Sequence, residues 1–406
     1  MGDWRVSRIF YCGMVNTAGY AVFIGEPLHI GAASNKMIAV VRAMRDAGAR
    51  ALLVSIPVLG RNARRVHAPE TILRDRDVPQ VFLPVFAHPY LRKICAIFSF
   101  AWFCVAKVRR SDRVILYNHA IEYLLGIMLL ALKGNKPILD VEDAPRVDEH
   151  GWQGFVGRSL FFLFFRLVCD RKLIVSESLA EMLGLCHYCV VYGAARSSSP
   201  PIGFVNQSSC GRPNTNGPIR IHYGGSLDTN TGVDLFCGAV DKLIGSLRRD
   251  ICQVHFIVTG FGSGAKIREL EKRCAGSGVR LSFYPDLSPE GYVDKFRRCH
   301  AALSLKLPES EMAITTFPSK VVEITMQGLL LISTKASDVP RLFDASSAVI
   351  LSETTANALF SAIMSVIADP VDMHQVARRG QERALDLFES KAVGKRIVDF
   401  VLYDKA

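Results

Sequence analysis

The chain has 406 residues, half of them hydrophobic, and a formal net charge of +11. This length predicts two domains of ordinary size with substantial cores. The positive charge indicates an anionic partner, such as a phosphorylated ligand or an acidic membrane surface. The sequence contains no RGG tract or other nucleic-acid-binding signature, so we expect no nucleic-acid partner. Residues 1–13 lack a long apolar segment, which argues against secretion, and the eleven cysteines are scattered as in a reduced cytosolic protein.

The first 200 residues alternate between predicted strands and helices. Residues 8–15 form a short apolar strand, residues 31–48 have apolar side chains at helical spacing, and residues 49–58 form a second strand. Further strands are predicted at residues 113–118, 136–142 and 172–176. A strand–helix–strand series of this kind predicts a parallel sheet.

Three segments of this half are unusually apolar and aromatic: residues 94–106, 123–132 and 155–169. Each is shorter than the ~20 apolar residues that cross a bilayer. One interpretation is that they form buried core helices. The other is that apolar helices surrounded by Lys and Arg dock this half of the chain on anionic lipid. The sequence leaves both interpretations open.

Residues 195–218 are rich in Ser, Pro, Asn and Gly and form the predicted linker. The α/β alternation resumes after it, with a strand into a glycine turn near Gly225, a helix, and a strand into a second glycine turn at 260–264. Later strands are predicted at residues 300–307, 329–334 and 347–352. The fold class is therefore α/β, with two Rossmann-like domains facing each other, at 1–200 and 201–375. A helical tail at 376–406 is expected to pack back toward the first domain.

Residues 315–334 contain the most informative pattern in the chain. Pro318 suits a first helical turn, because it has no N–H to lose there. Lys320 and Glu323 lie one turn apart and share a face. Gly328 suits the end of the helix, and the apolar run after it is a strand. A helix N-terminus with a nearby cation and carboxylate can hold a phosphate and a sugar hydroxyl together.

The segments 223–240, 256–264 and 317–334, in this order and spacing, resemble the donor-binding domain of retaining GT-B glycosyltransferases of the family 4 type. The resemblance covers about residues 219–388, and the Phe-Pro-Ser-Lys-x-x-Glu element at 317–323 is its most specific part. It implies that the second domain binds a nucleotide sugar, either UDP- or GDP-linked, and that no metal is needed.

The resemblance also implies the donor-site residues. Glu323 matches the residue that hydrogen-bonds the ribose. Thr316, Ser319 and Lys320 match the segment near the diphosphate and sugar. Gly225, Ser226, Gly260 and Gly262 belong to the two glycine turns, which a tight strand–helix connection would equally explain. Glu323 has an alternative role as a surface partner of Lys320.

The chain departs from the family at two positions. Many members have an Arg and a Lys that contact the diphosphate where this sequence has Ser226 and Thr231. Lys306 matches a basic position of relatives with the same element, so Lys306 and Lys320 are the expected sources of positive charge. Either lysine would alternatively be a solvated surface residue.

In the first half, His119 follows a predicted strand at the place where relatives have a His near the donor sugar. Glu142 and Asp143 follow another strand and are candidates for orienting acceptor hydroxyls or for general-base chemistry. A structural histidine and helix-capping acids before Pro145 are the alternatives.

These observations predict a retaining glycosyltransferase that adds a sugar to a lipid-linked, oligosaccharide or cell-envelope acceptor. It is expected in the cytoplasm, peripheral on the inner face of the plasma membrane. Two alternatives stay open. One is a non-catalytic GT-B-like scaffold or subunit of a glycosyltransferase complex, and the other is a sugar-nucleotide epimerase of the same fold, which would turn over without an acceptor.

Overall fold

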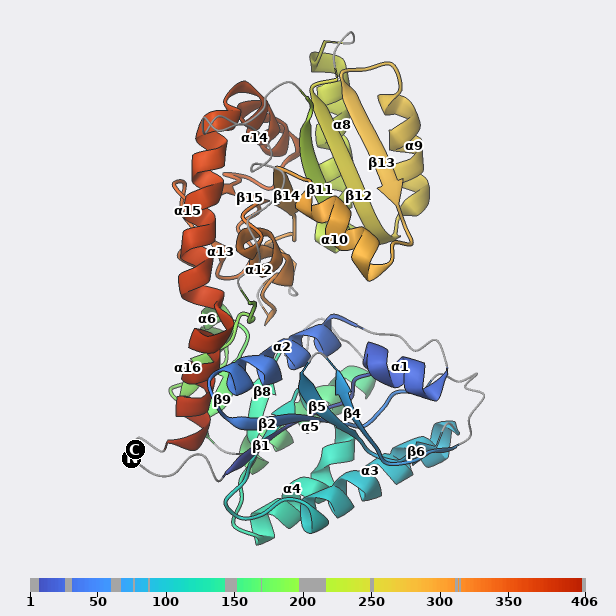
Figure 1. The fold of residues 1–406 in the computed structure, drawn as a ribbon, viewed down its shortest axis with the longest axis vertical. Helices are drawn as coiled ribbons and strands as arrows, with labels where there is room; N and C mark the ends of the chain where they lie inside the picture. Colours follow the sequence, from blue (N-terminus) through green and yellow to red (C-terminus); the bar gives the residue numbers. More distant parts are fainter. Residues whose placement is uncertain are drawn as a thin grey trace. The chain divides into compact units, whose positions relative to one another are not determined.

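The computed structural model describes residues 7–25, 31–59, 67–75, 77–86, 88–142, 152–168, 170–196, 217–248, 252–310, 313 and 315–403. The chain divides into two compact units. The first contains Met1–Arg196 and Glu389–Ala406, and the second contains Ser197–Phe388. Each unit has a largely parallel β-sheet with helices on both faces (Figure 1).

The first unit is built on an eight-stranded sheet with the order β10-β9-β8-β7-β1-β2-β5-β4, in which only β4 runs antiparallel to its neighbour. Its strands are β1 (Arg8–Gly13), β2 (Arg50–Ser55), β4 (Thr71–Asp75), β5 (Val78–Phe82), β7 (Arg113–Tyr117), β8 (Ile138–Val141), β9 (Lys172–Ile174) and β10 (Tyr188–Val190), with a separate pair β3 (His67–Ala68) and β6 (Val85–Phe86). Its helices are α1 (Ala18–Ile24), α2 (Ala32–Asp46), α3 (Pro89–Ala106), η1 (Ile121–Tyr123), α4 (Leu124–Leu132), α5 (Trp152–Leu167), α6 (Glu177–Met182) and α16 (Ser390–Leu402).

The direction of the connections decides which helices cover which face of this sheet. The step from β1 to β2 crosses the sheet one way, whereas the steps that lead to β7, β8 and β9 cross it the other way. Because such crossovers are right-handed, α2 covers one face and α3, α4 and α5 cover the other. The core on the α2 face joins α2, the strands and α16 through Tyr11, Met37, Val40 and Ile397, all 0% exposed.

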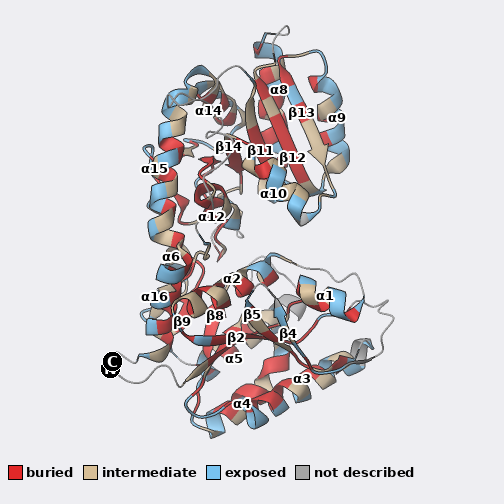
Figure 2. Cartoon of the chain, viewed as in Figure 1, coloured by how far each residue is buried: buried red, intermediate tan, exposed pale blue. Residues whose placement is uncertain are grey.

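The second unit contains a six-stranded parallel sheet with the order β13-β12-β11-β14-β15-β16. Its strands are β11 (Ile219–Leu227), β12 (Val254–Gly262), β13 (Val279–Tyr284), β14 (Ala301–Ser304), β15 (Leu330–Ser333) and β16 (Val349–Ile350). Its helices are η2 (Thr229–Thr231), α8 (Val233–Ser246), α9 (Gly264–Cys274), α10 (Pro289–Arg297), α12 (Ser319–Met326), α13 (Val339–Leu342), α14 (Ala356–Ala368) and α15 (Pro370–Phe388). Figure 2 shows the buried residues concentrated along the strands and the inner sides of the helices.

The helical tail is divided differently from the sequence-based boundaries. Helix α15 belongs to the second unit, where it packs on α12 and β15, and the division falls at Phe388/Glu389 instead of 375/376. Helix α16 packs on α2, so only the last part of the predicted tail returns to the first unit. The other division falls at Arg196/Ser197, close to the predicted 200/201, and most of the predicted linker lies outside the described residues.

The three apolar segments correspond to α3, α4 and α5. Each has a buried side, and on α3 this side contains Ala96, Phe100 and Cys104, none more than 1% exposed. The helices α3 and α4 pack closely at Gly126, where a Cβ would lie 2.5 Å from the Phe100 ring. Among the described helices, none is long and apolar enough to cross a membrane.

Candidate functional site

The two segments of the second unit that were predicted to be glycine turns are not turns. Their residues continue strands β11 and β12. The two strands pair through their glycines, with Gly225 opposite Gly260 and Leu227 opposite Gly262. Gly225, Gly260 and Gly262 have φ of 113°, 117° and 117°, which L-residues rarely adopt. A Cβ on Gly260 would lie 1.9 Å from the Gly225 carbonyl oxygen. Close strand pairing therefore requires glycine, and it leaves bare backbone at the carboxyl end of the sheet.

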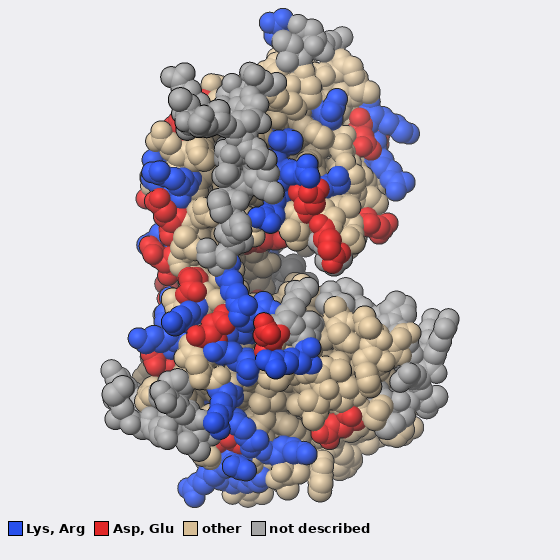
Figure 3. Space-filling model, viewed as in Figure 1, with Lys and Arg blue, Asp and Glu red and all other residues tan. Residues whose placement is uncertain are grey.

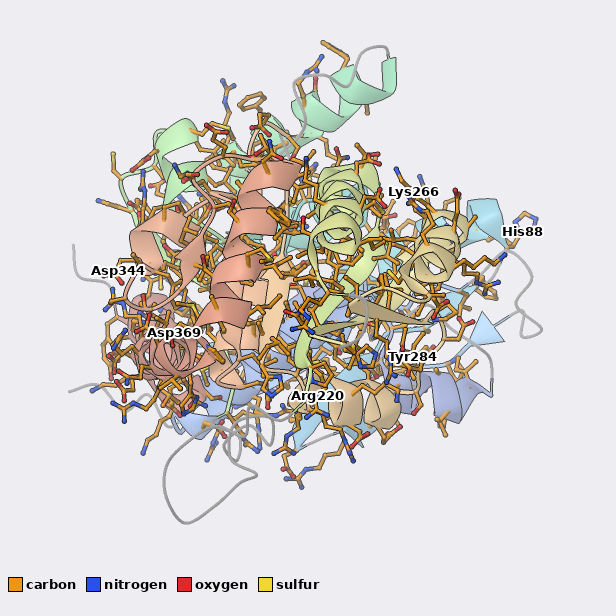
Figure 4. All side chains as sticks on the ribbon, turned by 90° about the horizontal axis from the view of Figure 1, so that it is seen from above. His88, Arg220, Lys266, Tyr284, Asp344 and Asp369 are labelled. Atoms are coloured by element: carbon orange, nitrogen blue, oxygen red, sulfur yellow. The ribbon has the colours of Figure 1, made fainter. Side chains whose placement is uncertain are left out.

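A pocket of about 280 Å³ opens at this end of the second unit. It brings together three of the predicted residues, Gly225, Gly260 and Lys320. It also contains residues that the sequence did not indicate, Thr259, Phe261, Tyr284, Pro285, Leu287 and Tyr292. Tyr284, labelled in Figure 4, ends β13, and Tyr292 lies on α10. The lining thus combines flat aromatic side chains with one cation, which suits a ligand that has a planar ring and an anionic group.

Lys320 is the cation of this pocket and lies on the first turn of α12. Its ammonium donates to the Tyr292 hydroxyl at 2.7 Å and to the Glu323 carboxylate at 3.0 Å, and it lies 4.9 Å from the centre of the Tyr292 ring. The side chains of Lys320 and Glu323 stay 28% and 36% exposed. Lys320 and Glu323 therefore share one helix face, as predicted, and remain accessible to a ligand.

Tyr292 stays a neutral phenol in this environment. Burial is the main cause of its raised pKa, and the nearby Glu323 carboxylate raises it further. The hydroxyl accepts from Lys320 and so fixes the lysine beside the pocket.

The helix that carries Lys320 begins one residue later than predicted. Pro318 is the N-cap residue of α12, with φ −71° and ψ 104°, and Ser319 is the first helical residue, with an exposed side chain. Gly328 adopts φ 72° after the helix, as expected of a residue that ends one.

Ser226, at the end of β11, and Thr231, in the turn before α8, make hydrogen bonds within this part of the chain. The Ser226 hydroxyl donates to the Asp228 carboxylate, and the Thr231 hydroxyl donates to the Ser226 carbonyl at 2.6 Å. Asp228 and Thr231 form a reciprocal capping box around η2. These side chains stabilise the turn itself and add a carboxylate, with no positive charge.

Lys306 and Thr316 contact each other, since the Lys306 ammonium donates to the Thr316 hydroxyl. Lys306 follows β14, and Thr316 precedes α12. Neither of them lines the pocket, and the same holds for Ser226, Gly262, Ser319 and Glu323. Glu323 is joined to the pocket through its ion pair with Lys320. The structure thus gathers part of the predicted donor residues into two groups, one around Lys320 and one at the Lys306–Thr316 contact, and leaves Ser226 and Gly262 outside both.

A buried histidine behind the pocket was missed by the sequence interpretation. His222 on β11 is 1% exposed, and its Nε2 lies 2.9 Å from the hydroxyl of Thr259, which lines the pocket. Burial lowers the pKa of His222 well below its usual value, and the positive charge of Lys320 contributes. His222 is therefore neutral and supports Thr259. Its place within a buried strand gave no signal that separates it from an ordinary core residue.

The predicted catalytic residues lie in the first unit. The His119 ring packs edge-on against Phe161 and Phe164 of α5, at centroid distances of 5.2 and 6.3 Å. Glu142 pairs with Lys36 of α2, and its backbone N–H donates to the Asn118 side chain at 2.8 Å. Asp143 lies outside the described residues.

Lys36 and Asn118 were not singled out from the sequence. Asn118 has φ 55° and joins the ends of β7 and β8, because its N–H donates to the Asp140 carbonyl at 2.8 Å. An Asn directly after a strand is the kind of residue that tolerates this backbone conformation, which is the signal that could have found it. The described residues contain no group of three or more His, Cys, Asp or Glu side chains arranged to hold a metal ion.

Comparisons with known proteins bear on the fold of the chain. Residues 250–399 match the protein-family model described as "Glycosyl transferase-like". No curated protein matches the sequence significantly. Among solved structures, HepE of Anabaena in complex with UDP is 13% identical over 97% of this chain and 98% of its own, with a TM-score of 0.63.

Two other solved structures show the same fold. Sucrose-phosphate synthase from Thermosynechococcus elongatus is 12% identical over 96% of this chain and 97% of its own, with a TM-score of 0.65. The lipopolysaccharide outer core galactosyltransferase WaaB is 16% identical over 97% and 99%, with a TM-score of 0.60. The likeness to these proteins extends over nearly the whole chain and confirms the predicted GT-B fold.

Proposed function

We propose that this chain, a glycosyltransferase of the GT-B fold, transfers a sugar from a UDP-linked donor to a lipid-linked or cell-envelope saccharide with retention of anomeric configuration. The observation that carries the proposal is the pocket at the ends of β11 and β12, where Lys320 joins Tyr292 and Glu323 beside bare glycine backbone. UDP is chosen because HepE, a structural neighbour, was solved in complex with UDP.

Each part of a nucleotide diphosphate has a suitable partner among these residues. The aromatic residues Phe261 and Tyr284 offer flat faces to the base. Glu323, which is 36% exposed, accepts hydrogen bonds from vicinal ribose hydroxyls. Lys320 and the N-terminus of α12 attract the diphosphate through their positive charge and free backbone donors. Gly225 and Gly260 let the ligand approach the backbone closely.

Lys320 also has a role in the transfer step. As the bond between the anomeric carbon and the diphosphate oxygen breaks, negative charge grows on the leaving diphosphate. Lys320 stabilises that charge, and Lys306, held by Thr316, adds to the positive field from the end of β14. This arrangement requires no metal ion in our proposal. His119, Glu142 and Asp143 remain the candidates for contacts with the transferred sugar and the acceptor.

The acceptor and location belong to the same proposal. WaaB, a structural neighbour, is a lipopolysaccharide outer core galactosyltransferase, and the net charge of +11 favours an anionic surface. We therefore place the protein on the cytoplasmic face of the plasma membrane, bound peripherally to it, with a membrane-bound saccharide as its acceptor.

A donor screen tests the function directly. The purified protein is incubated with UDP-, GDP- and ADP-linked sugars, and release of the free nucleotide is followed with and without lipid extract from a bacterial envelope. We expect release from a UDP-sugar that rises when the acceptor is added. Conversion of the donor into an epimerised sugar nucleotide without acceptor and without release of free nucleotide would indicate an epimerase instead.

A non-catalytic scaffold is the second candidate, and the segment at Ser226–Thr231 is the observation that favours it. That segment uses its polar side chains to close a turn around Asp228 and supplies no cation. A scaffold would bind none of the three nucleotides, whereas an enzyme that relies on Lys320 binds UDP with a strong dependence on ionic strength.

A further inference from the structure

The outer side of α3 is apolar along its whole length. Leu91, Ile94, Phe98, Trp102 and Val105 are 51%, 52%, 62%, 67% and 44% exposed. They recur every three or four residues, so they form one stripe on the side opposite the buried Ala96, Phe100 and Cys104. From Leu91 to Val105 this stripe is about 21 Å long at the rise of an α-helix.

The two neighbouring helices of the same layer extend this apolar surface. On α4, Met128 and Leu132 are 57% and 84% exposed, and on α5 the exposed apolar residues are Phe155, Val156, Phe162, Leu163 and Leu167. In the described part of the second unit, which is of similar size, the exposed large apolar residues are Phe261, Val293 and Val371. The described residues of α2 and α16, on the opposite face of the first sheet, contribute none.

The described charges of this layer are nearly all positive, and the exposed Asp170 after α5 is an exception. The sequences of α3, α4 and α5 contain no acidic residue. Glu122 of the short η1 helix between them is buried, and Asp112 is buried and paired with Arg8. Exposed cations lie at the helix ends, at Lys93, Lys107, Arg109, Arg110, Lys136 and Arg166. Figure 3 shows Lys and Arg along the left side of this unit, reaching its lower end.

We propose that the outer side of α3, α4 and α5 docks on an anionic lipid bilayer, with Phe98 and Trp102 of α3 entering the boundary between headgroups and acyl chains. This inference rests on the proposed function for the membrane-bound acceptor and names the surface that brings the enzyme to it. Apolar side chains in the centre with cations at the ends match a surface of anionic headgroups over hydrocarbon. A second protein surface would need many carboxylates to meet these cations, whereas anionic lipid supplies negative charge everywhere.

Vesicle flotation with the full-length protein tests this docking. The wild type is mixed with vesicles of phosphatidylcholine alone or of phosphatidylcholine with phosphatidylglycerol. Phe98→Glu and Trp102→Glu are compared with Val371→Glu, which places the same charge on an exposed apolar residue of α15, 45% exposed. We expect the wild type and Val371→Glu to float with the anionic vesicles. Phe98→Glu and Trp102→Glu should each weaken that binding about tenfold or more.

A tryptophan signal shows insertion directly and does not depend on loss of binding. The chain has three tryptophans, so Trp4→Phe with Trp152→Phe leaves Trp102 as the only one. We expect its emission to shift to shorter wavelength on anionic vesicles and to be quenched by lipids brominated on the acyl chain. An unshifted and unquenched signal from vesicle-bound protein would contradict insertion of α3.

Other outcomes also overturn the proposal. Binding to anionic vesicles that Phe98→Glu and Trp102→Glu leave unchanged would place docking elsewhere on the protein. A concentration-dependent dimer in light scattering that Phe98→Glu abolishes would mean that a second copy covers the stripe. UDP binding is measured in the same variants without vesicles. If the wild type binds UDP normally but does not bind the vesicles, only this inference is contradicted. If the wild type does not bind UDP, the proposed function is contradicted.

Discussion

At the scale of single residues, the donor pocket depends on one lysine that has few neighbours of its own charge. Lys320 contacts Tyr292 and Glu323 and lines the pocket, while the segment between Ser226 and Thr231 has Asp228 in place of cations. The affinity for a diphosphate should therefore depend on Lys320 more than in a site with several basic residues. This consequence could be anticipated from the absence of basic residues between Arg220 and Lys242 in the sequence.

We predict that Lys320→Gln lowers the affinity for UDP about tenfold or more, because a charge-assisted contact to phosphate contributes roughly 1.5–3 kcal/mol. The remaining affinity should also depend less on ionic strength. Lys335→Gln removes an exposed lysine of the same unit and should leave UDP binding unchanged. Fluorescence competition with a labelled UDP analogue at two salt concentrations measures both effects. Equal affinities for the two variants would remove Lys320 from the site.

His222 makes the stability of the second unit dependent on pH. Its pKa is depressed in the folded protein by burial and by Lys320, so below about pH 6.5 the unfolded chain takes up a proton that the folded chain does not. The stability that the folded protein owes to a neutral His222 is therefore fully present above pH 6.5 and declines as the pH falls. The free energy of unfolding should drop by up to about 1.4 kcal/mol per pH unit from this residue.

The variant His222→Gln keeps a side chain that can hydrogen-bond the Thr259 hydroxyl but does not titrate. We predict that its unfolding free energy falls less steeply between pH 7 and pH 5.5 than that of the wild type. Urea unfolding followed by circular dichroism measures the two slopes. Other histidines with lowered pKa, His255 and His374, are present in both proteins and cancel in the comparison. Identical slopes would show that His222 is not the titrating group.

At the scale of elements, the pairing of β11 with β12 through their glycines is the feature that shapes the pocket. A side chain on Gly260 would collide with the Gly225 carbonyl at 1.9 Å, and φ of 117° adds strain. Gly245 of α8 has open space around its Cβ position and ordinary helical backbone. These two glycines form a matched pair for the same substitution.

We predict that Gly260→Ala lowers the free energy of unfolding by roughly 2–4 kcal/mol and weakens UDP binding, because the strand ends must separate. Gly245→Ala should raise stability by up to about 1 kcal/mol, because alanine favours the helix. Urea unfolding of both variants measures the two changes in the free energy of unfolding. A Gly260→Ala protein as stable as the wild type would mean that the strand ends accommodate a side chain.

The elements also show how far the sequence could be interpreted. Apolar periodicity predicted β1, α2, β7, β8 and β9 at nearly their observed positions, because these elements are buried in a regular way. The glycine-rich ends of β11 and β12 were taken for turns, since glycine has no local preference for strand and only the pairing of Gly225 with Gly260 extends these strands. The amphipathic character of α3 was also hidden, because aromatic residues occupy both of its sides.

At the scale of the whole molecule, the chain passes from the first unit to the second and returns for its last helix. Helix α16 is fixed to α2 at close range. A Cβ on Gly394 would lie 1.8 Å from the Ala43 carbonyl oxygen, and the Ser390 hydroxyl donates to Asp46 at 2.8 Å. The sequence predicted that the C-terminal tail returns to the first unit. It could not predict where the returning part begins, because long-range packing alone decides where α15 ends.

We predict that Gly394→Val separates α16 from α2 and makes residues 389–403 sensitive to protease. Ala392→Val lies on the exposed side of the same helix and should leave it resistant. Limited trypsin digestion followed by mass spectrometry compares the two variants, since Lys391, Lys395 and Arg396 are cleavage sites in this helix. Equal resistance of both proteins would show that α16 tolerates a side chain against α2.

Binding of uridine diphosphate to the second unit through Glu323 and its neighbours is the premise of the proposed function, and calorimetric titration with UDP measures it. We expect saturable binding to the wild type, a loss of about tenfold or more in affinity for Glu323→Ala, and unchanged binding for Glu353→Ala, which removes an exposed carboxylate of the same unit. Wild-type protein that does not bind UDP, or a Glu323→Ala variant that binds UDP as tightly as the wild type, would contradict this assignment.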